Sequence, residues 1–152
     1  MPKGRGVCQE YDFYAWTQKQ AALLKSGQWD QLDIANLVEE IEALGRQERR
    51  ELLHRLGILV GHLLKWQLQP HLRGKSWRAT ITERRRQIQR LLRDSPSLKP
   101  DLSAALQEAH QDGILLVVRE TPLSEADLPA QCPYTFEQVM DPDFYPGKED
   151  PQ

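Results

Sequence analysis

A long stretch of helical periodicity, residues 33–69, constrains the fold of this chain more than any other feature. Its apolar residues recur every three or four positions, which lines them along one side of an α-helix. Asp33 can cap the first turn, and Pro70 ends the segment because proline cannot continue a helix. The segment forms one helix of about 35 residues, or two helices if Gly45 marks a break; we favour one helix with a weak point at Gly45, since glycine is a poor helix former. The apolar positions are Ile34, Leu37, Val38, Ile41, Leu44, Leu52, Leu56, Leu59, Leu63 and Trp66.

Three shorter segments show the same helical spacing. Asp12 can cap the first of them and Gly27 can end it, while Ser76 can cap the next. No segment shows the alternating pattern of a strand. The sequence therefore predicts further helices over residues 11–27, 76–94 and 98 or 101–120.

The last part of the sequence, residues 121–146, is a proline-rich tail. Its prolines exclude a long helix, but Thr135-Phe-Glu-Gln138 has the spacing of a capping box and predicts one short helical turn. The tail is too rich in apolar residues for a solvated extension, so we expect it to pack on the helices. These apolar residues are Tyr134, Phe136, Val139, Met140, Phe144 and Tyr145.

Four amphipathic helices can hide their apolar stripes only against one another. We therefore expect an all-α, up-and-down helical bundle of about four main helices, with the Pro-rich C-terminal tail packed across it. A chain of 152 residues has the size of one domain. We expect a single helical domain over residues 11–146, including the tail at 121–146, with flexible ends at residues 1–10 and 147–152.

Several motifs, taken in chain order, resemble one bacterial family. They span about residues 11–146 and are DFYAWTQKQAALLKSG, LDIANLVEEIEALG, HLLKWQ, SWRATI, SPSL and CPYTFEQVMDPDFYP. This pattern is similar to the family called domain of unknown function 29, which is common in photosynthetic bacteria. The resemblance implies an all-helical fold and no established activity, so it assigns no catalytic residue.

The sequence indicates a cytoplasmic protein without membrane association. Its apolar runs fall far short of the roughly 18 residues needed to cross a bilayer. The N-terminus lacks the apolar segment of a secretion signal. Cys8 and Cys132 have no Cys-x-x-Cys partner, so we expect free thiols in a reducing compartment.

The stretch VEEIEALGRQERRELLH, residues 38–54, raises the question of a metal site because it contains Glu51-x-x-His54. A di-iron bundle needs this step on each of two helices, and the chain has it once. Glu40, Glu51 and His62 share one flank of the helix, but neighbours in this row are about 16 Å apart. Ligands of one metal lie within about 2 to 2.5 Å of it. We interpret these carboxylates as a charged surface and expect no metal and no cofactor.

Two charged residues fall within apolar stripes. Glu48 lies in the stripe of the long helix, and Arg84 lies between Ile81 and Ile88. Burying an unpaired charge is costly, so we predict a partner of opposite charge for each, with a buried Glu48–Arg84 ion pair as one solution. The alternative is that both side chains reach water from the edge of the stripe.

Charge is segregated along the chain. Nine basic residues and one acidic residue lie between Lys65 and Arg93, which gives this segment a net charge of +8. From Glu120 onward the net charge is −7, so the tail can cover the basic segment. No nucleic-acid-binding motif accompanies the arginines, and we favour a neutralised or solvated face. The candidate basic binding face consists of Arg78, Arg85, Arg86, Arg90 and Arg93.

Residues for catalysis are not apparent. The sequence has no Gly-x-Ser-x-Gly elbow, no Walker loop and no glycine-rich phosphate cradle. We interpret Cys132 as an inert thiol and the four tryptophans, Trp16, Trp29, Trp66 and Trp77, as core or core-edge residues. We predict a non-enzymatic, regulatory or interaction domain that binds another protein or another copy of itself. The alternatives are a nucleic-acid-associated protein that uses residues 65–93, and an enzyme or metal protein whose site forms only in three dimensions.

Overall fold

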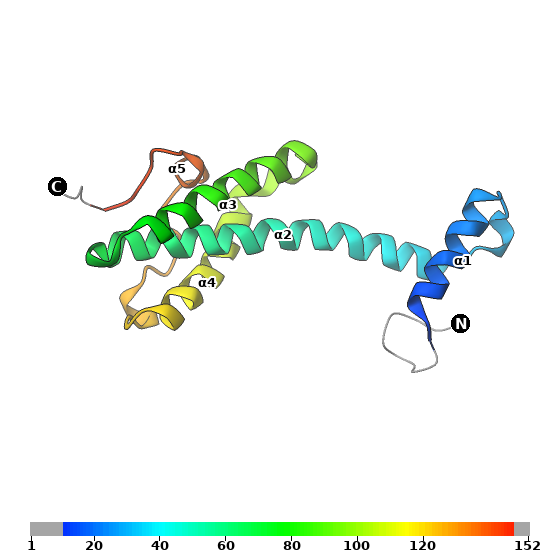
Figure 1. Cartoon of the computed structure of the whole chain (residues 1–152), viewed down its shortest axis with the longest axis horizontal. Coiled ribbons are helices and arrows are strands. Elements are labelled where there is room, and N and C mark those ends of the chain that lie inside the picture. The colour runs from blue at the N-terminus through cyan, green and yellow to red at the C-terminus, as the bar shows by residue number, and fades with distance from the viewer. Residues whose placement is uncertain (1–10, 148–152) are drawn as a thin grey trace. The chain divides into compact units, whose positions relative to one another are not determined.

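The computed structural model describes residues 11–147, which form an all-α structure with four main helices and no strand (Figure 1). The predicted fold class is therefore confirmed. The flexible ends expected at residues 1–10 and 147–152 lie outside the described residues, except for Gly147. The α-helices are α1 (Phe13–Lys25), α2 (Ile34–Leu68), α3 (Lys75–Asp94), α4 (Leu102–Glu120) and α5 (Phe136–Met140), and the short 3-10 helices are η1 (Trp29–Gln31), η2 (Pro70–Leu72), η3 (Pro96–Asp101) and η4 (Glu125–Asp127).

The helix expected over residues 33–69 is present as α2, which continues through Gly45. The chain nevertheless divides into two compact units, with the boundary inside α2 between Glu48 and Arg49. Unit 1 is described over residues 11–48 and unit 2 over residues 49–147. Their behaviour as a single domain over residues 11–146 stays a prediction.

Unit 1 is a helical hairpin made of α1 and the N-terminal part of α2. Asp33 holds the two helices together: its carboxylate accepts hydrogen bonds from Trp16 Nε1 and Asn36 Nδ2, both at 2.9 Å. The Asp33 backbone N–H donates to Gln20 Oε1 at 2.8 Å. The hydrogen bonds from Asn36 and Trp16 hold the pKa of the Asp33 carboxyl below its ordinary value. Asp33 thus fixes the start of α2 against α1.

Two ends of the first helix follow the sequence prediction. The Asp12 side chain caps α1 by accepting from the Ala15 N–H at 3.0 Å. After α1 the chain turns at Gly27, whose φ of 75° lies in the left-handed region that favours glycine.

The predicted cap at Ser76 is wrong, because α3 begins at Lys75 and Gly74 occupies the N-cap position.

The hydrophobic core lies in unit 2, among the C-terminal part of α2, α3, α4 and the tail. Each helix contributes a stripe at helical spacing, as the sequence indicates. Burial of these side chains is the main favourable term in the folding of unit 2. Fully or almost fully buried members include Leu52, Leu56, Leu59, Leu63, Ile81, Ile88, Leu106, Val117 and Val139.

Within unit 2, helices α2 and α4 approach each other closely at Gly57, Gly61 and Gly113. A Cβ atom on Gly113 would lie 3.1 Å from the backbone nitrogen of Gly61 and 3.2 Å from the carbonyl oxygen of Gly57. A Cβ on Gly61 would in turn lie 3.2 Å from the carbonyl oxygen of Gly113. The absence of side chains at these positions allows the two backbones to pack directly against each other.

The C-terminal tail packs across unit 2, as expected (Figure 1). Tyr134 is buried and its hydroxyl donates to Gln67 Oε1 on α2 at 2.6 Å. Burial raises the pKa of this phenol. The predicted turn is α5, where the Thr135 hydroxyl accepts from the Gln138 N–H and the Gln138 side chain accepts from the Thr135 N–H. The tail is therefore part of the folded unit.

Substituting Gly113→Ala tests the close approach of α2 and α4. The added methyl group would press on two backbone atoms that cannot rotate away, so we expect a loss of about 1–3 kcal/mol in the free energy of unfolding. The matched control is Gly45→Ala in α2, where no atom lies within 4 Å of the new Cβ. This control should gain up to about 1 kcal/mol from helix propensity. Urea unfolding followed by circular dichroism measures both, and equal stability of Gly113→Ala and the parent would contradict the packing described.

Candidate functional site

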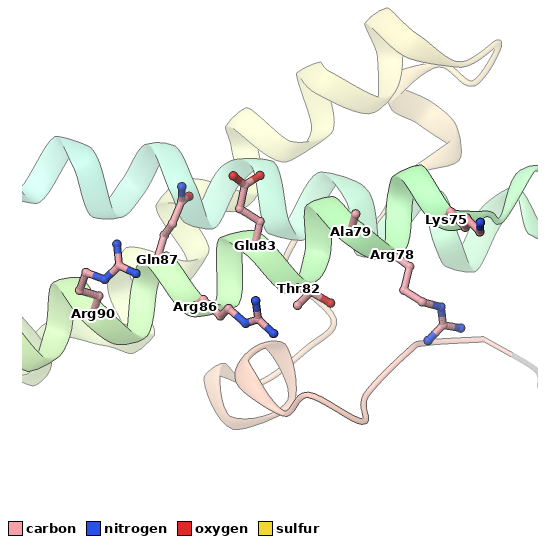
Figure 2. A pocket seen from close by; sticks show the side chains of 8 residues that line it. All are labelled: Lys75, Arg78, Ala79, Thr82, Glu83, Arg86, Gln87 and Arg90. Carbon is pink, nitrogen blue, oxygen red and sulfur yellow. The ribbon is translucent and has the colours of Figure 1, made fainter.

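The exposed side of α3 forms the first candidate site, a shallow depression of about 650 Å³. Figure 2 shows that every side chain lining it comes from this one helix. Arg86 and Arg90 are exposed here, and Arg93 is exposed one turn further on. Glu83 is the one carboxylate in the depression, so its net charge is strongly positive. The lining residues are Lys75, Arg78, Ala79, Thr82, Glu83, Arg86, Gln87 and Arg90.

Arg85 does not belong to this exposed face, which corrects its inclusion among the predicted binding residues. It is 4% exposed, and its Nε and Nη2 atoms donate to the carbonyl oxygens of Val139 and Phe144, both at 2.7 Å. Burial lowers its pKa, and this effect is opposed by Tyr145 and Asp141 nearby. The guanidinium of Arg85 thus fixes the tail to α3 with two hydrogen bonds from one planar group.

Arg78 lines the depression and also contacts two aromatic rings. Its guanidinium carbon is 4.4 Å from the ring centre of Tyr145 and 5.0 Å from that of Trp66. Arg73 also contacts Trp66: its guanidinium carbon is 5.2 Å from the ring centre, and its Nε donates to the Trp66 carbonyl oxygen at 2.7 Å. Arginine side chains therefore hold the aromatic rings of the tail against α2 and α3.

Lys65, which the sequence places in the basic segment, is also buried. Its ammonium donates to Glu120 Oε1 at 2.6 Å and lies 4.9 Å from the ring centre of Trp77. The Lys65 side chain is 4% exposed, whereas that of Glu120 is 49% exposed. The hydrogen bond from Lys65 lowers the pKa of Glu120, and burial lowers the pKa of the neighbouring His62. The pair links the end of α2 to the end of α4.

The predicted Glu48–Arg84 ion pair stays a prediction, since the two residues belong to different units. Glu48 is exposed in unit 1. Arg84 is half-buried in unit 2, and its Nη1 donates to Gln87 Oε1 at 2.8 Å. Arg84 therefore has at least one polar partner on its own helix.

The carboxylate-rich stretch of α2 carries an ordinary surface pair. Glu51 Oε1 lies 2.7 Å from Arg55 Nη2 at i,i+4 spacing, and His54 is exposed. Over residues 11–147, no three His, Cys, Asp or Glu side chains lie together in a way that could hold a metal ion. Cys132 is a half-buried free thiol whose pKa is raised by burial. None of these residues forms a convergent constellation in the described part of the chain.

The second candidate site is an apolar groove in unit 1, which sequence reasoning missed. The groove has a volume of about 400 Å³ and lies between α1 and the N-terminal part of α2. Its apolar lining is Phe13, Trp16, Ala21 and Leu24 from α1, and Leu37, Ile41, Ala43 and Leu44 from α2.

The groove is part of a larger exposed apolar face. Across residues 11–147 there are nine exposed large apolar side chains, and seven of them lie in unit 1. Single exposed apolar residues are common, but such a concentration in one small unit is unusual. We define the apolar face of unit 1 as Leu24 (45% exposed), Ile34 (56%), Val38 (47%), Ile41 (64%) and Leu44 (63%).

The exposed residues on α2 follow the pattern of a helix that packs on another helix. Ile34, Val38 and Ile41 are spaced by four and then three residues, which is the spacing of a coiled-coil seam. Leu37 and Leu44 flank this row on one side, at an interval of seven residues. Sequence analysis recognised the same residues as an apolar stripe but assigned them to a bundle core. Trp29, also expected in or near the core, is 61% exposed.

Comparison with known proteins identifies the family. The family model described as "Domain of unknown function DUF29" matches residues 9–145, and the chain belongs to this family. No curated protein and no solved structure matches the chain. Among the described residues, no helix combines the length and the apolar character needed to pass through a bilayer.

Substituting Arg85→Lys tests whether this arginine fixes the tail. A lysine ammonium cannot donate to both carbonyl oxygens in the same planar geometry, so one buried acceptor loses its partner. We expect a loss of about 1–3 kcal/mol in stability, together with faster protease cleavage within residues 121–146. Arg86→Lys is the matched control at the exposed neighbour and should change stability by less than about 0.5 kcal/mol. Equal melting temperatures and cleavage rates for the two variants would contradict the role of Arg85.

Proposed function

We propose that this domain is a non-enzymatic protein-interaction module in which unit 1 binds the partner and unit 2 is a stable scaffold. The supporting observation is the exposed apolar face of unit 1, defined above by Leu24, Ile34, Val38, Ile41 and Leu44. Keeping five large apolar side chains in water is unfavourable, and covering them would release that cost. Unit 2, in contrast, buries its own core and its tail.

The shape of the groove is consistent with a helical partner. Two helices, α1 and α2, form its walls, and the apolar residues of α2 recur at the interval of a helix seam. A partner helix can place its own apolar residues between these rows, as amphipathic helices do in hydrophobic grooves. The residues around the groove include Glu40 and Gln47, which provide a polar rim.

A specific observation also supports a second candidate function, nucleic-acid binding by α3. Arg86, Arg90 and Arg93 are exposed and lie at i, i+4 and i+7, so they share one side of the helix. Phosphate groups would be attracted to such a row. The face is smaller than the sequence indicates, because Arg85 and Lys65 are buried and bonded within unit 2. We therefore rank this function below protein binding.

Affinity capture from a native cell extract tests the protein-binding proposal. The parent chain is compared with Ile41→Glu, which places a charge in the groove, and with Leu115→Glu, an equivalent change at an exposed leucine of α4 in unit 2. We expect the parent and Leu115→Glu to retain the same protein, which can be further copies of this chain, and Ile41→Glu to lose it. Retention that is unaffected by Ile41→Glu, or no retained protein at all, would contradict the proposal.

A salt titration of duplex DNA binding tests the second function. If the exposed row binds phosphates, the double variant Arg86→Gln/Arg90→Gln should reduce the slope of log K against log salt by about 2. Arg46→Gln in unit 1 is a matched control at an exposed arginine outside α3 and should leave the slope unchanged. Absence of DNA binding by the parent at low salt, or a slope that the double variant does not change, would reject this function.

A further inference from the structure

We propose that unit 2 binds a phosphate group in a small hollow between α3 and the tail. Thr82, Arg86 and Gln89 donate to the phosphate, and the buried charge of Arg85 lies beside them. The ligand is a terminal phosphate, which is either the free anion or a phosphate monoester. The hollow lies wholly within unit 2, so this proposal is independent of the binding role of unit 1.

The lining of the hollow suits an anion. Its volume is about 200 Å³, and since liquid water takes up about 30 Å³ per molecule, the space has room for a phosphate group. Each polar side chain in the wall can donate hydrogen bonds, and none of the lining residues is acidic. The lining residues are Thr82, Arg85, Arg86 and Gln89 from α3, and Met140 and Pro142 from the tail.

Helix geometry brings the donors of α3 together. Thr82, Arg86 and Gln89 follow one another at intervals of four and three residues, so they lie along one side of the helix. The side chains of Thr82 and Arg86 lie on the side of α3 that is turned to α5, which ends at Met140 (Figure 2). Thr82 is half-buried, while Arg86 and Gln89 are exposed. A ligand can therefore reach this row from solvent.

Arg85 adds a positive charge that no ion pair neutralises within the described part of the chain. It is 4% exposed, and its Nε and Nη2 donate to uncharged carbonyl oxygens. Its Nη1 is buried and has no hydrogen-bond partner among residues 11–147. A buried charge without a counter-ion is costly, and the protein screens it less than water would. An anion in the adjoining hollow would reduce this cost.

The acidic residues near Arg85, Asp141 and Asp143, do not replace such an anion. Both are exposed, so water and salt screen their charges, and neither lines the hollow. The Asp141 carboxylate accepts from the Asp143 N–H at 2.9 Å, which holds it within the turn of the tail. The wall thus contains two guanidinium groups and no carboxylate. This balance favours a phosphate with two negative charges over an anion with one.

Isothermal titration calorimetry of the full chain with inorganic phosphate, at constant ionic strength, tests the site. We expect the parent to bind, and Arg86→Gln to bind about tenfold more weakly because a charge-assisted contact is lost. Thr82→Val removes the hydroxyl but keeps the branched shape, and should weaken binding about threefold. Arg90→Gln removes the same charge outside the hollow and should weaken binding by less than about twofold. Circular dichroism checks that each variant stays folded.

Two further ligands identify the form of the phosphate group. Tighter binding of phosphoserine than of inorganic phosphate would assign the site to a phosphate monoester, and the reverse order would assign it to the free anion. Dimethyl phosphate is a diester with a single negative charge. It should bind about tenfold more weakly than the tighter of the other two ligands, because only one charge faces the two guanidinium groups.

Three results would overturn the proposal. No heat of binding, together with a melting temperature that phosphate does not raise, would exclude the site. Equal weakening by Arg86→Gln and Arg90→Gln would show a diffuse attraction to the exposed arginines of α3. Dimethyl phosphate that binds as tightly as phosphate would contradict the need for two charges. Ile41→Glu in unit 1 should bind phosphate as the parent does, so failure here is distinct from failure of the protein-binding proposal.

Discussion

The organisation of this protein depends on how much apolar surface each unit can bury by itself. Unit 2 closes a core from three helices and a tail, and the leucines and isoleucines of this core are almost completely buried. Unit 1 has two α-helices within residues 11–48, and a helical hairpin has one side left over after its helices face each other. Its seven exposed large apolar side chains are the consequence. Burial of such surface is the main driving force of folding and association, and this difference is the basis of our proposal that unit 1 binds a partner and unit 2 is a scaffold.

The arginine-rich helix α3 shows that one basic segment can serve two purposes. Arg85 is directed to the interior, where its fork binds two carbonyl oxygens of the tail. Arg78 contacts the aromatic rings of Trp66 and Tyr145. Arg86 and Arg90 stay exposed. The tail therefore packs on α3 through its backbone and rings, and it leaves part of the positive face in solvent.

The helices could be predicted from the sequence because their apolar residues repeat at regular intervals. The caps at Asp12 and Thr135 were also predictable, because each has the side chain that a first turn needs. The N-cap of α3 was misplaced by two residues, because Gly74 offers no side chain to recognise. The burial of Arg85 had a signal, since it lies four residues after Ile81 and three before Ile88. Its charge argued against the interior, and only the position of the tail carbonyls explains why it lies there.

The apolar groove of unit 1 could not be predicted in the same way. The row from Ile34 to Leu44 has the same spacing as the row from Leu52 to Trp66, although the first is largely exposed and the second is buried. Periodicity shows which side of a helix is apolar, but not what covers it. The partner of each row is decided by tertiary structure, which places α3, α4 and the tail on the second row within unit 2.

Amide hydrogen exchange at several protein concentrations tests the central claim most directly, because it reports on each helix separately. If unit 1 buries too little apolar surface to be stable by itself, amides in α1 and in residues 34–48 should be less protected than those in α3 and α4 when the chain has no partner. Protection in unit 1 that equals that of unit 2 and does not change with concentration would show that the hairpin is stable alone. That result would contradict the role of unburied apolar surface in this protein.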